Sequence, residues 1–149
     1  MGHYVGSVLI KAPREVVFDF HTDTRNLPKI MPGNIAVVSF EMKGAGQGAL
    51  IDLKMRWRGL LSTRWLIELE VFDRPNALVD LQIKGPFKHF RHVRTFREEA
   101  GGTLLTDDLS YELPFGFLGR IIEKIALAPT IRSQFAFRHR KTKEILDTV

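Results

Sequence analysis

The chain has 149 residues, of which 44% are hydrophobic and 26% are charged, and it contains no cysteine. This length and composition predict one globular domain spanning residues 1–149, with apolar runs too short for a membrane span. The absence of cysteine excludes disulfides, thiolate metal sites and a cysteine nucleophile. The formal net charge of +5 favours anionic partners. The first residues lack the pattern of a secretion signal, so a cytoplasmic location is expected.

The hydrophobic pattern predicts a strand followed by two short helices at the start of the chain. Residues 3–11 alternate as in a strand. Pro13 then suits the first turn of a helix, because its missing amide proton is not needed there. Asp23 can cap a second short helix, which Pro32 and Gly33 would end.

Between residues 34 and 112 the pattern has the two-residue period of β-strands. Six strand patterns follow one another at hairpin spacing, separated by turn residues. In the fourth of them, the apolar face carries Ala77, Val79, Leu81 and Ile83, and the polar face carries Asp80, Gln82 and Lys84. Consecutive hairpins of this kind indicate one curved antiparallel sheet.

After Pro114 the period returns to that of a helix. Pro129 is expected to bend this helix, because proline lacks an amide proton and clashes with the preceding turn. The apolar stripe of the helix comprises Leu118, Ile121, Ile122, Ile125, Ile131, Phe135 and Leu146. The predicted fold class is therefore α+β: a strand, two short helices, six further antiparallel strands in a curved sheet, and a long C-terminal helix gripped by that sheet.

This order of elements resembles the helix-grip fold of the START-like superfamily, also called SRPBCC, which includes the birch-pollen allergens. Residues 10–18, I-K-A-P-R-E-V-V-F, are similar to the family's I-x-A-P-x-E-x-V-F entry to its first helix. Residues 23–27 resemble the D-x-x-N-L segment that follows. Residues 85–116 resemble the G-P-F…H…F…G-T…D…Y-x-L-P-x-G hairpin of the bacterial ligand-binding branch, which includes polyketide cyclases/dehydratases and lipid-transport proteins.

The resemblance implies a mostly apolar cavity between the sheet and the terminal helix. The expected function is binding, for transport or sequestration, of a small hydrophobic ligand such as a lipid, polyketide or isoprenoid. Carriers, enzymes and regulators share this scaffold, so two alternatives stay open. One is a cyclase or dehydratase, and the other is a regulatory domain that interacts with protein or RNA.

Polar residues of the last two strands form the first candidate site. His92 and Arg94 share one face of their strand, and Asp107 and Tyr111 share one face of the next. A four-residue hairpin loop would place Arg94 nearly opposite Asp107, with His92 diagonal to it. In an apolar cavity these groups would have shifted pKa values and could anchor a ligand, or His92 and Asp107 could act as acid and base. A purely structural ion-pair network is the alternative.

Aromatic and apolar side chains on the inward faces complete the predicted binding site. The apolar ligand-binding set is Met55, Trp57, Trp65 and Phe90 on the strands, with Ile121 and Ile125 on the terminal helix. Ordinary core packing is the alternative for each of them. Periodicity does not distinguish a packed interior from a hollow one.

The sequence carries no signature of a metal or a cofactor, and none is expected. His89 and His92 lie on one predicted strand and face opposite ways, so they do not form a zinc pair. Basic residues are frequent within 56–64 and within 132–143. They indicate either transient contact with an anionic membrane or an ordinary solvated basic surface. No nucleic-acid-binding module is recognisable, so nucleic acid is not an expected partner. The sequence leaves the oligomeric state open.

Overall fold

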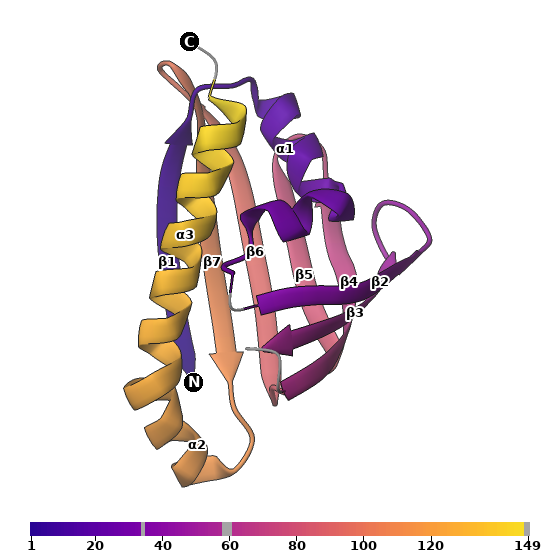
Figure 1. The fold of residues 1–149 in the computed structure, drawn as a ribbon. Helices are drawn as coiled ribbons and strands as arrows, with labels where there is room; N and C mark the ends of the chain where they lie inside the picture. The colour runs from indigo at the N-terminus through magenta and orange to yellow at the C-terminus, as the bar shows by residue number, and fades with distance from the viewer. Residues whose placement is uncertain (34, 58–60, 148–149) are drawn as a thin grey trace.

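In the described part of the chain, residues 1–33, 35–57 and 61–147, seven strands form one antiparallel sheet (Figure 1). The side chains of Trp57 and Leu61 lie outside this description of the computed structural model. The strands are β1 (Gly2–Ile10), β2 (Ile35–Lys43), β3 (Leu50–Trp57), β4 (Leu61–Asp73), β5 (Ala77–Lys84), β6 (His89–Glu99) and β7 (Gly102–Glu112). Their order across the sheet is β1-β7-β6-β5-β4-β3-β2, so β1 pairs with the last strand.

Two short helices and a long C-terminal helix lie over one face of this sheet (Figure 1). Helix α1 (Arg14–Thr22) begins after Pro13. A 3₁₀ helix, η1 (Thr24–Ile30), follows it, and the Asp23 carboxylate accepts a hydrogen bond from the Arg25 amide at its start. These elements confirm the predicted helix-grip order and the predicted cap.

The C-terminal helix changes type along its length. It consists of α2 (Gly116–Ile122), a π-helical turn η2 (Glu123–Leu127) and α3 (Ala128–Leu146). Pro129 lies in the first turn of α3, directly after the π-helical turn. Because proline has no amide to donate, the regular hydrogen-bond ladder is interrupted at this point, which is where the sequence predicted a bend.

The orientation of β5 differs from the sequence-based expectation. Leu78 pairs with Arg94, and Asp80 pairs with His92, so Leu78 and Asp80 lie on the face that carries the helices. The pattern placed Asp80 on the polar face of this strand, and that face lies against the helices. The strand has apolar residues on both faces, and a buried charge that is neutralised by a neighbouring strand does not show in a hydrophobic pattern.

Two apolar clusters of described residues occupy parts of the space between the sheet and the helices. The first is formed by Ile10, Ala12, Val17, Phe18, Leu78, Phe96 and Leu105. The second, which includes residues of α3, is formed by Leu109, Tyr111, Ile131 and Phe135. Along β7, where every second residue is buried, Asp107 lies between Leu105 of the first cluster and Leu109 of the second. A buried polar layer therefore separates the two clusters.

Candidate functional site

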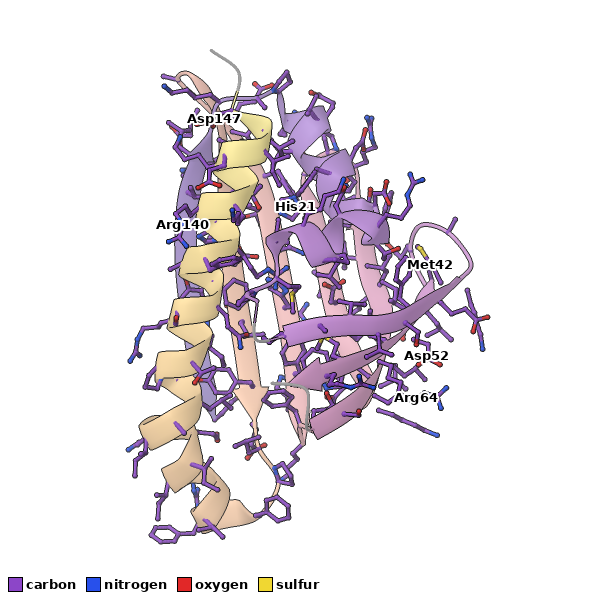
Figure 2. The ribbon with its side chains drawn as sticks, in the orientation of Figure 1. His21, Met42, Asp52, Arg64, Arg140 and Asp147 are labelled. Atoms are coloured by element: carbon purple, nitrogen blue, oxygen red, sulfur yellow. The ribbon has the colours of Figure 1, made fainter. Side chains whose placement is uncertain are left out.

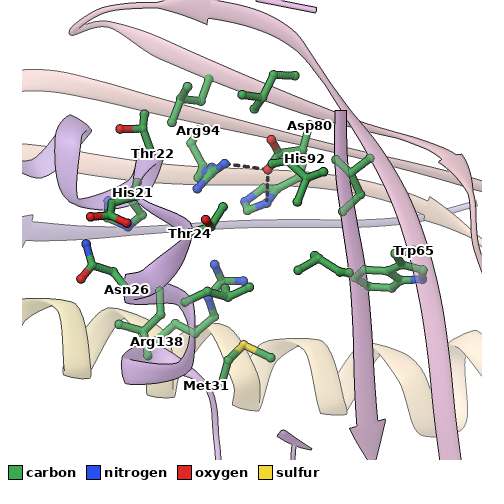
Figure 3. A pocket seen from close by; sticks show the side chains of 18 of the residues that line it. His21, Thr22, Thr24, Asn26, Met31, Trp65, Asp80, His92, Arg94 and Arg138 are labelled. Carbon is green, nitrogen blue, oxygen red and sulfur yellow. Dashed lines mark hydrogen bonds and ion pairs between the residues drawn. The ribbon is translucent and has the colours of Figure 1, made fainter. Parts of the chain in front are cut away.

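A cavity of about 130 Å³ lies between the sheet and the helices (Figure 3). Most of its sheet side is apolar and is lined by Ile51, Leu53, Met55, Trp65, Ile67, Leu69, Leu78 and Phe90. Residues of α1 and η1 line another side, and Arg138 reaches it from α3. An apolar cavity of about 150 Å³ is known to hold benzene. The cavity therefore accommodates one ring or a short stretch of chain.

An ion pair on β5 and β6 forms part of the cavity wall. Arg94 Nη2 donates to Asp80 Oδ2 over 2.6 Å, and His92 Nδ1 lies 3.9 Å from the same oxygen (Figure 3). Asp80 Oδ1 and Arg94 Nε are buried, and neither has a hydrogen-bond partner among the described residues. Buried polar groups normally have partners, so this ion pair is incompletely satisfied.

Asp107 lies behind His92 and does not line the cavity. Its carboxylate accepts hydrogen bonds from His92 Nε2 at 2.6 Å and from His139 Nε2 at 2.5 Å. Burial raises the pKa of Asp107, but the hydrogen bonds from His139 and His92 outweigh burial and hold this pKa well below its usual value. Asp107 is therefore ionised at neutral pH and orients both imidazoles.

The two histidines of the cavity wall are neutral at pH 7. Burial lowers the pKa of His92, although its hydrogen bond to Asp107 acts in the opposite direction. Burial, together with the charge of Arg94, lowers the pKa of His21 to about 3, and His21 Nδ1 lies 2.8 Å from the Val17 carbonyl oxygen. A neutral His92 that donates through Nε2 carries its lone pair on Nδ1.

Arg138 adds a cation from the helix side. This half-buried side chain lines the cavity, and its guanidinium carbon lies 5.1 Å from the centre of the Phe135 ring. Within the described ranges the Arg138 guanidinium forms no hydrogen bond and no close ion pair, although the charges of Asp107 and Asp80 favour its protonated form. Burial lowers the pKa of Arg138, but a guanidinium stays protonated at neutral pH.

A model of the polyketide cyclase/dehydrase and lipid transport family matches residues 10–129. The chain belongs to this family. No curated protein sequence matches it. No helix of the described residues is long and apolar enough to cross a membrane.

Several solved structures share the fold. Protein CV1439 from Chromobacterium violaceum has a TM-score of 0.80 at 9% identity, with all of both chains covered. TTHA0849 from Thermus thermophilus has a TM-score of 0.72 at 21% identity, with 95% of this chain and 97% of that chain covered. The di-domain ARO/CYC StfQ from the steffimycin biosynthetic pathway has a TM-score of 0.75 at 12% identity, with 97% of this chain and 50% of that chain covered. At these identities the likeness concerns the fold alone.

Of the nine predicted ligand-binding residues whose side chains are described, five line the cavity. Those that line it are Met55, Trp65, Phe90, His92 and Arg94. Asp107 lies behind the wall, and Tyr111 belongs to the apolar cluster that packs on α3. The side chain of Trp57 falls outside the described residues.

Ile121 and Ile125 do not line the cavity, contrary to the sequence-based expectation. Ile125 is 74% exposed and Ile121 is 38% exposed, whereas Ile131 and Phe135 are buried. The prediction treated the C-terminal segment as one helix with a bend near Pro129 and expected no change of helical period before that residue. The π-helical turn Glu123–Leu127, which contains Ile125, breaks that period. Ile121 and Ile125 therefore lie on a different side of the helix from Ile131 and Phe135.

Sequence reasoning missed four polar residues that surround the cavity or support it. His139 continues the buried stripe of α3, in which Ile131, Phe135, His139 and Thr142 follow at spacings of four, four and three. That spacing was an available signal. Asp80 was predicted only as part of the polar face of its strand, and the positions of His21 and Arg138 depend on tertiary packing that no local pattern shows.

The basic surface predicted on the strands is partly neutralised. Arg64 donates to both oxygens of Asp52, at 3.0 and 2.7 Å, at a site away from α3 (Figure 2). Arg58 lies outside the described residues. On α3, Arg138 faces the cavity, and Lys143 pairs with Asp147 at 2.8 Å.

Proposed function

We propose that this protein binds a small hydrophobic molecule that carries an acidic or polar end group. The observation that supports this proposal is the position of Arg138, a half-buried cation that lies beside an apolar wall and forms no hydrogen bond or close ion pair among the described residues. Partial removal of a guanidinium from water is unfavourable unless an anion or acceptor compensates for it. A ligand carboxylate would supply that acceptor through a charge-assisted hydrogen bond.

The apolar wall would supply the remaining affinity. In this conformation the space of about 130 Å³ accommodates a ring-sized group. A lipid, polyketide or isoprenoid would therefore insert one end, and the segment 22–31 would have to move outward to admit more of it. Burial of each additional methylene would add roughly 0.8 kcal/mol of affinity.

The test uses phenylacetate, which combines one ring with one carboxylate. NMR titration should show shifts confined to the cavity residues, and Arg138→Met should weaken binding roughly tenfold or more because it removes a charge-assisted hydrogen bond. Arg140→Met is the matched control, since Arg140 is exposed on the same helix. Unchanged phenylacetate affinity in Arg138→Met would contradict the proposal. Native mass spectrometry and organic extraction of the purified protein would identify a natural ligand.

Acid–base catalysis of the cyclase or dehydratase type is the second candidate function. It is favoured by the neutral His92 in the cavity wall, whose Nδ1 lone pair can accept a proton. Asp107 would then position His92 and would not touch the substrate. Loss of water from a β-hydroxy thioester, abolished in His92→Gln and retained in Arg140→Met, would favour catalysis. Binding of such a compound without turnover would favour the carrier function.

A further inference from the structure

A large apolar surface lies exposed at one end of the C-terminal helix. Its residues, which we call the helix-tip face, are Phe115, Phe117, Leu118, Ile121, Ile122 and Ile125. Phe115, Phe117 and Ile125 are each more than 70% exposed, at 75%, 73% and 74%. α2 lies at the end of the helix away from the C-terminus (Figure 1). Contiguous apolar patches on soluble proteins commonly mark an interaction site.

Among residues 113–132, which form and adjoin the helix-tip face, the exposed charged side chains are all basic. Between residues 113 and 132 the charged residues are Arg120, Glu123, Lys124 and Arg132. The three basic side chains are exposed, whereas Glu123 is only 4% exposed. The face therefore combines apolar side chains with a cationic rim, and the acidic group of this segment is withdrawn from solvent.

The backbone conformation of the turn before α2 directs the helix-tip face toward solvent. Phe115 has a φ of 78°, in the left-handed region that non-glycine residues rarely adopt, and its ring nevertheless stays in solvent. Gly119 packs so closely against the Pro114 carbonyl that a Cβ atom would clash with it. The turn before α2 is thus tightly packed, and it presents Phe115 and Phe117 away from the core.

We propose that the helix-tip face docks on an anionic phospholipid bilayer. The apolar side chains would lie at the boundary of the acyl chains, and Arg120, Lys124 and Arg132 would lie among the phosphate groups. Interfacial amphipathic helices bind membranes through this combination of apolar area and cationic charge. A second copy of the chain fits less well, because a symmetric contact would bring the same cations together.

Co-sedimentation with vesicles tests the proposal. Vesicles of phosphatidylcholine with one quarter phosphatidylglycerol should bind the protein, pure phosphatidylcholine should bind it less, and added salt should weaken binding. Phe117→Ser and Ile125→Ser should each reduce binding roughly tenfold, and Lys124→Glu by a similar factor. Phe40→Ser is the matched control, since Phe40 is an exposed apolar residue on β2. Undiminished binding by the Phe117→Ser/Ile125→Ser double variant would overturn the proposal.

Two further measurements separate this proposal from others. Arg138→Met should retain vesicle binding while it loses phenylacetate affinity, so each proposal can fail independently. Analytical ultracentrifugation of the wild type should show a monomer. A dimer that Phe117→Ser dissociates, together with no binding to anionic vesicles, would overturn membrane docking and assign the helix-tip face to self-association.

Discussion

His139 on α3 and Asp107 on β7 are joined by a hydrogen bond of 2.5 Å, which ties the C-terminal helix to the sheet. The other carboxylate oxygen of Asp107 accepts from His92, whose ring lines the cavity. One buried carboxylate thus links the helix, the sheet and the cavity wall. Its removal should affect the stability of the fold and the orientation of His92 together.

Asp107→Asn should lower the free energy of unfolding by about 2–3 kcal/mol. The amide loses the negative charge that strengthens two buried hydrogen bonds, and such charge-assisted bonds are worth about 1.5–3 kcal/mol each. Asp108→Asn is the matched control, because Asp108 accepts from the exposed His3 on the other face of the same strand. Urea denaturation measures both variants. Equal losses of unfolding free energy in the two variants would show that the buried hydrogen bonds of Asp107 stabilise the fold no more than the exposed one of Asp108.

Stability should fall as the pH is lowered from 6.5 towards 4. The folded-state pKa of His21 is about 3 and that of His92 is also lowered, so the unfolded chain binds more protons than the folded protein across this range. Below the ordinary pKa of 3.8, Asp107 adds to the loss, because its pKa is depressed in the folded state. All three groups therefore act in the same direction.

The variant His21→Phe isolates one of these protons. At about pH 5 the slope of unfolding free energy against pH should decrease by up to about 1.4 kcal/mol per pH unit, the value for one proton. Denaturation at pH 8, where His21 is neutral in both states, measures the packing cost of the substitution separately. Parallel pH profiles for the wild type and His21→Phe would refute the assignment.

The sequence predicted those contacts of the site that form within one hairpin, but not those between more distant strands. Arg94 lies opposite Asp107 in the β6–β7 hairpin, as predicted, because a short hairpin sets its own register. Arg94 nevertheless forms its ion pair with Asp80, which lies on the strand at the other side of β6. Hairpin reasoning does not reach that strand, and the hydrophobic pattern placed Asp80 only on the polar face of its strand.

In the C-terminal helix, the sequence pattern did not show the change of helical period. A uniform period correctly marks Ile131 and Phe135 as buried but places Ile121 and Ile125 inside as well. The π-helical turn Glu123–Leu127 contains Ile125 and lies just before Pro129, and a hydrophobic count does not show it. The overall fold, by contrast, is visible because alternation within each strand is a local property.

Arg94→Met should destabilise the protein by about 3 kcal/mol, since it leaves the buried Asp80 carboxylate without its cation. The double variant Arg94→Met/Asp80→Asn should recover part of that loss, because the uncompensated charge is gone. Thermal and urea denaturation of the two single variants and the double variant complete the cycle. Additive losses would indicate that the pair is not energetically coupled.

Leu53→Trp should occupy part of the cavity and weaken phenylacetate binding more than tenfold. Because the added atoms enter existing space, the free energy of unfolding should change by less than about 1 kcal/mol. Leu109→Trp is the matched control in the packed cluster, where overpacking should cost about 1–3 kcal/mol. A larger loss of stability in Leu53→Trp than in Leu109→Trp would contradict a hollow interior at this position.

The pairing of β1 with β7 has a consequence for how the chain reaches its native state. The hydrogen bond between His3 and Asp108 joins residues 105 positions apart, whereas the strands from β2 to β7 are joined as successive hairpins. On the ribosome, β1 emerges first but has no strand to pair with until β7 has been synthesised. Closing so long a loop carries an entropic cost that short hairpins avoid. Folding should therefore proceed from the hairpins, with the N-terminal strand and the C-terminal helix joining last.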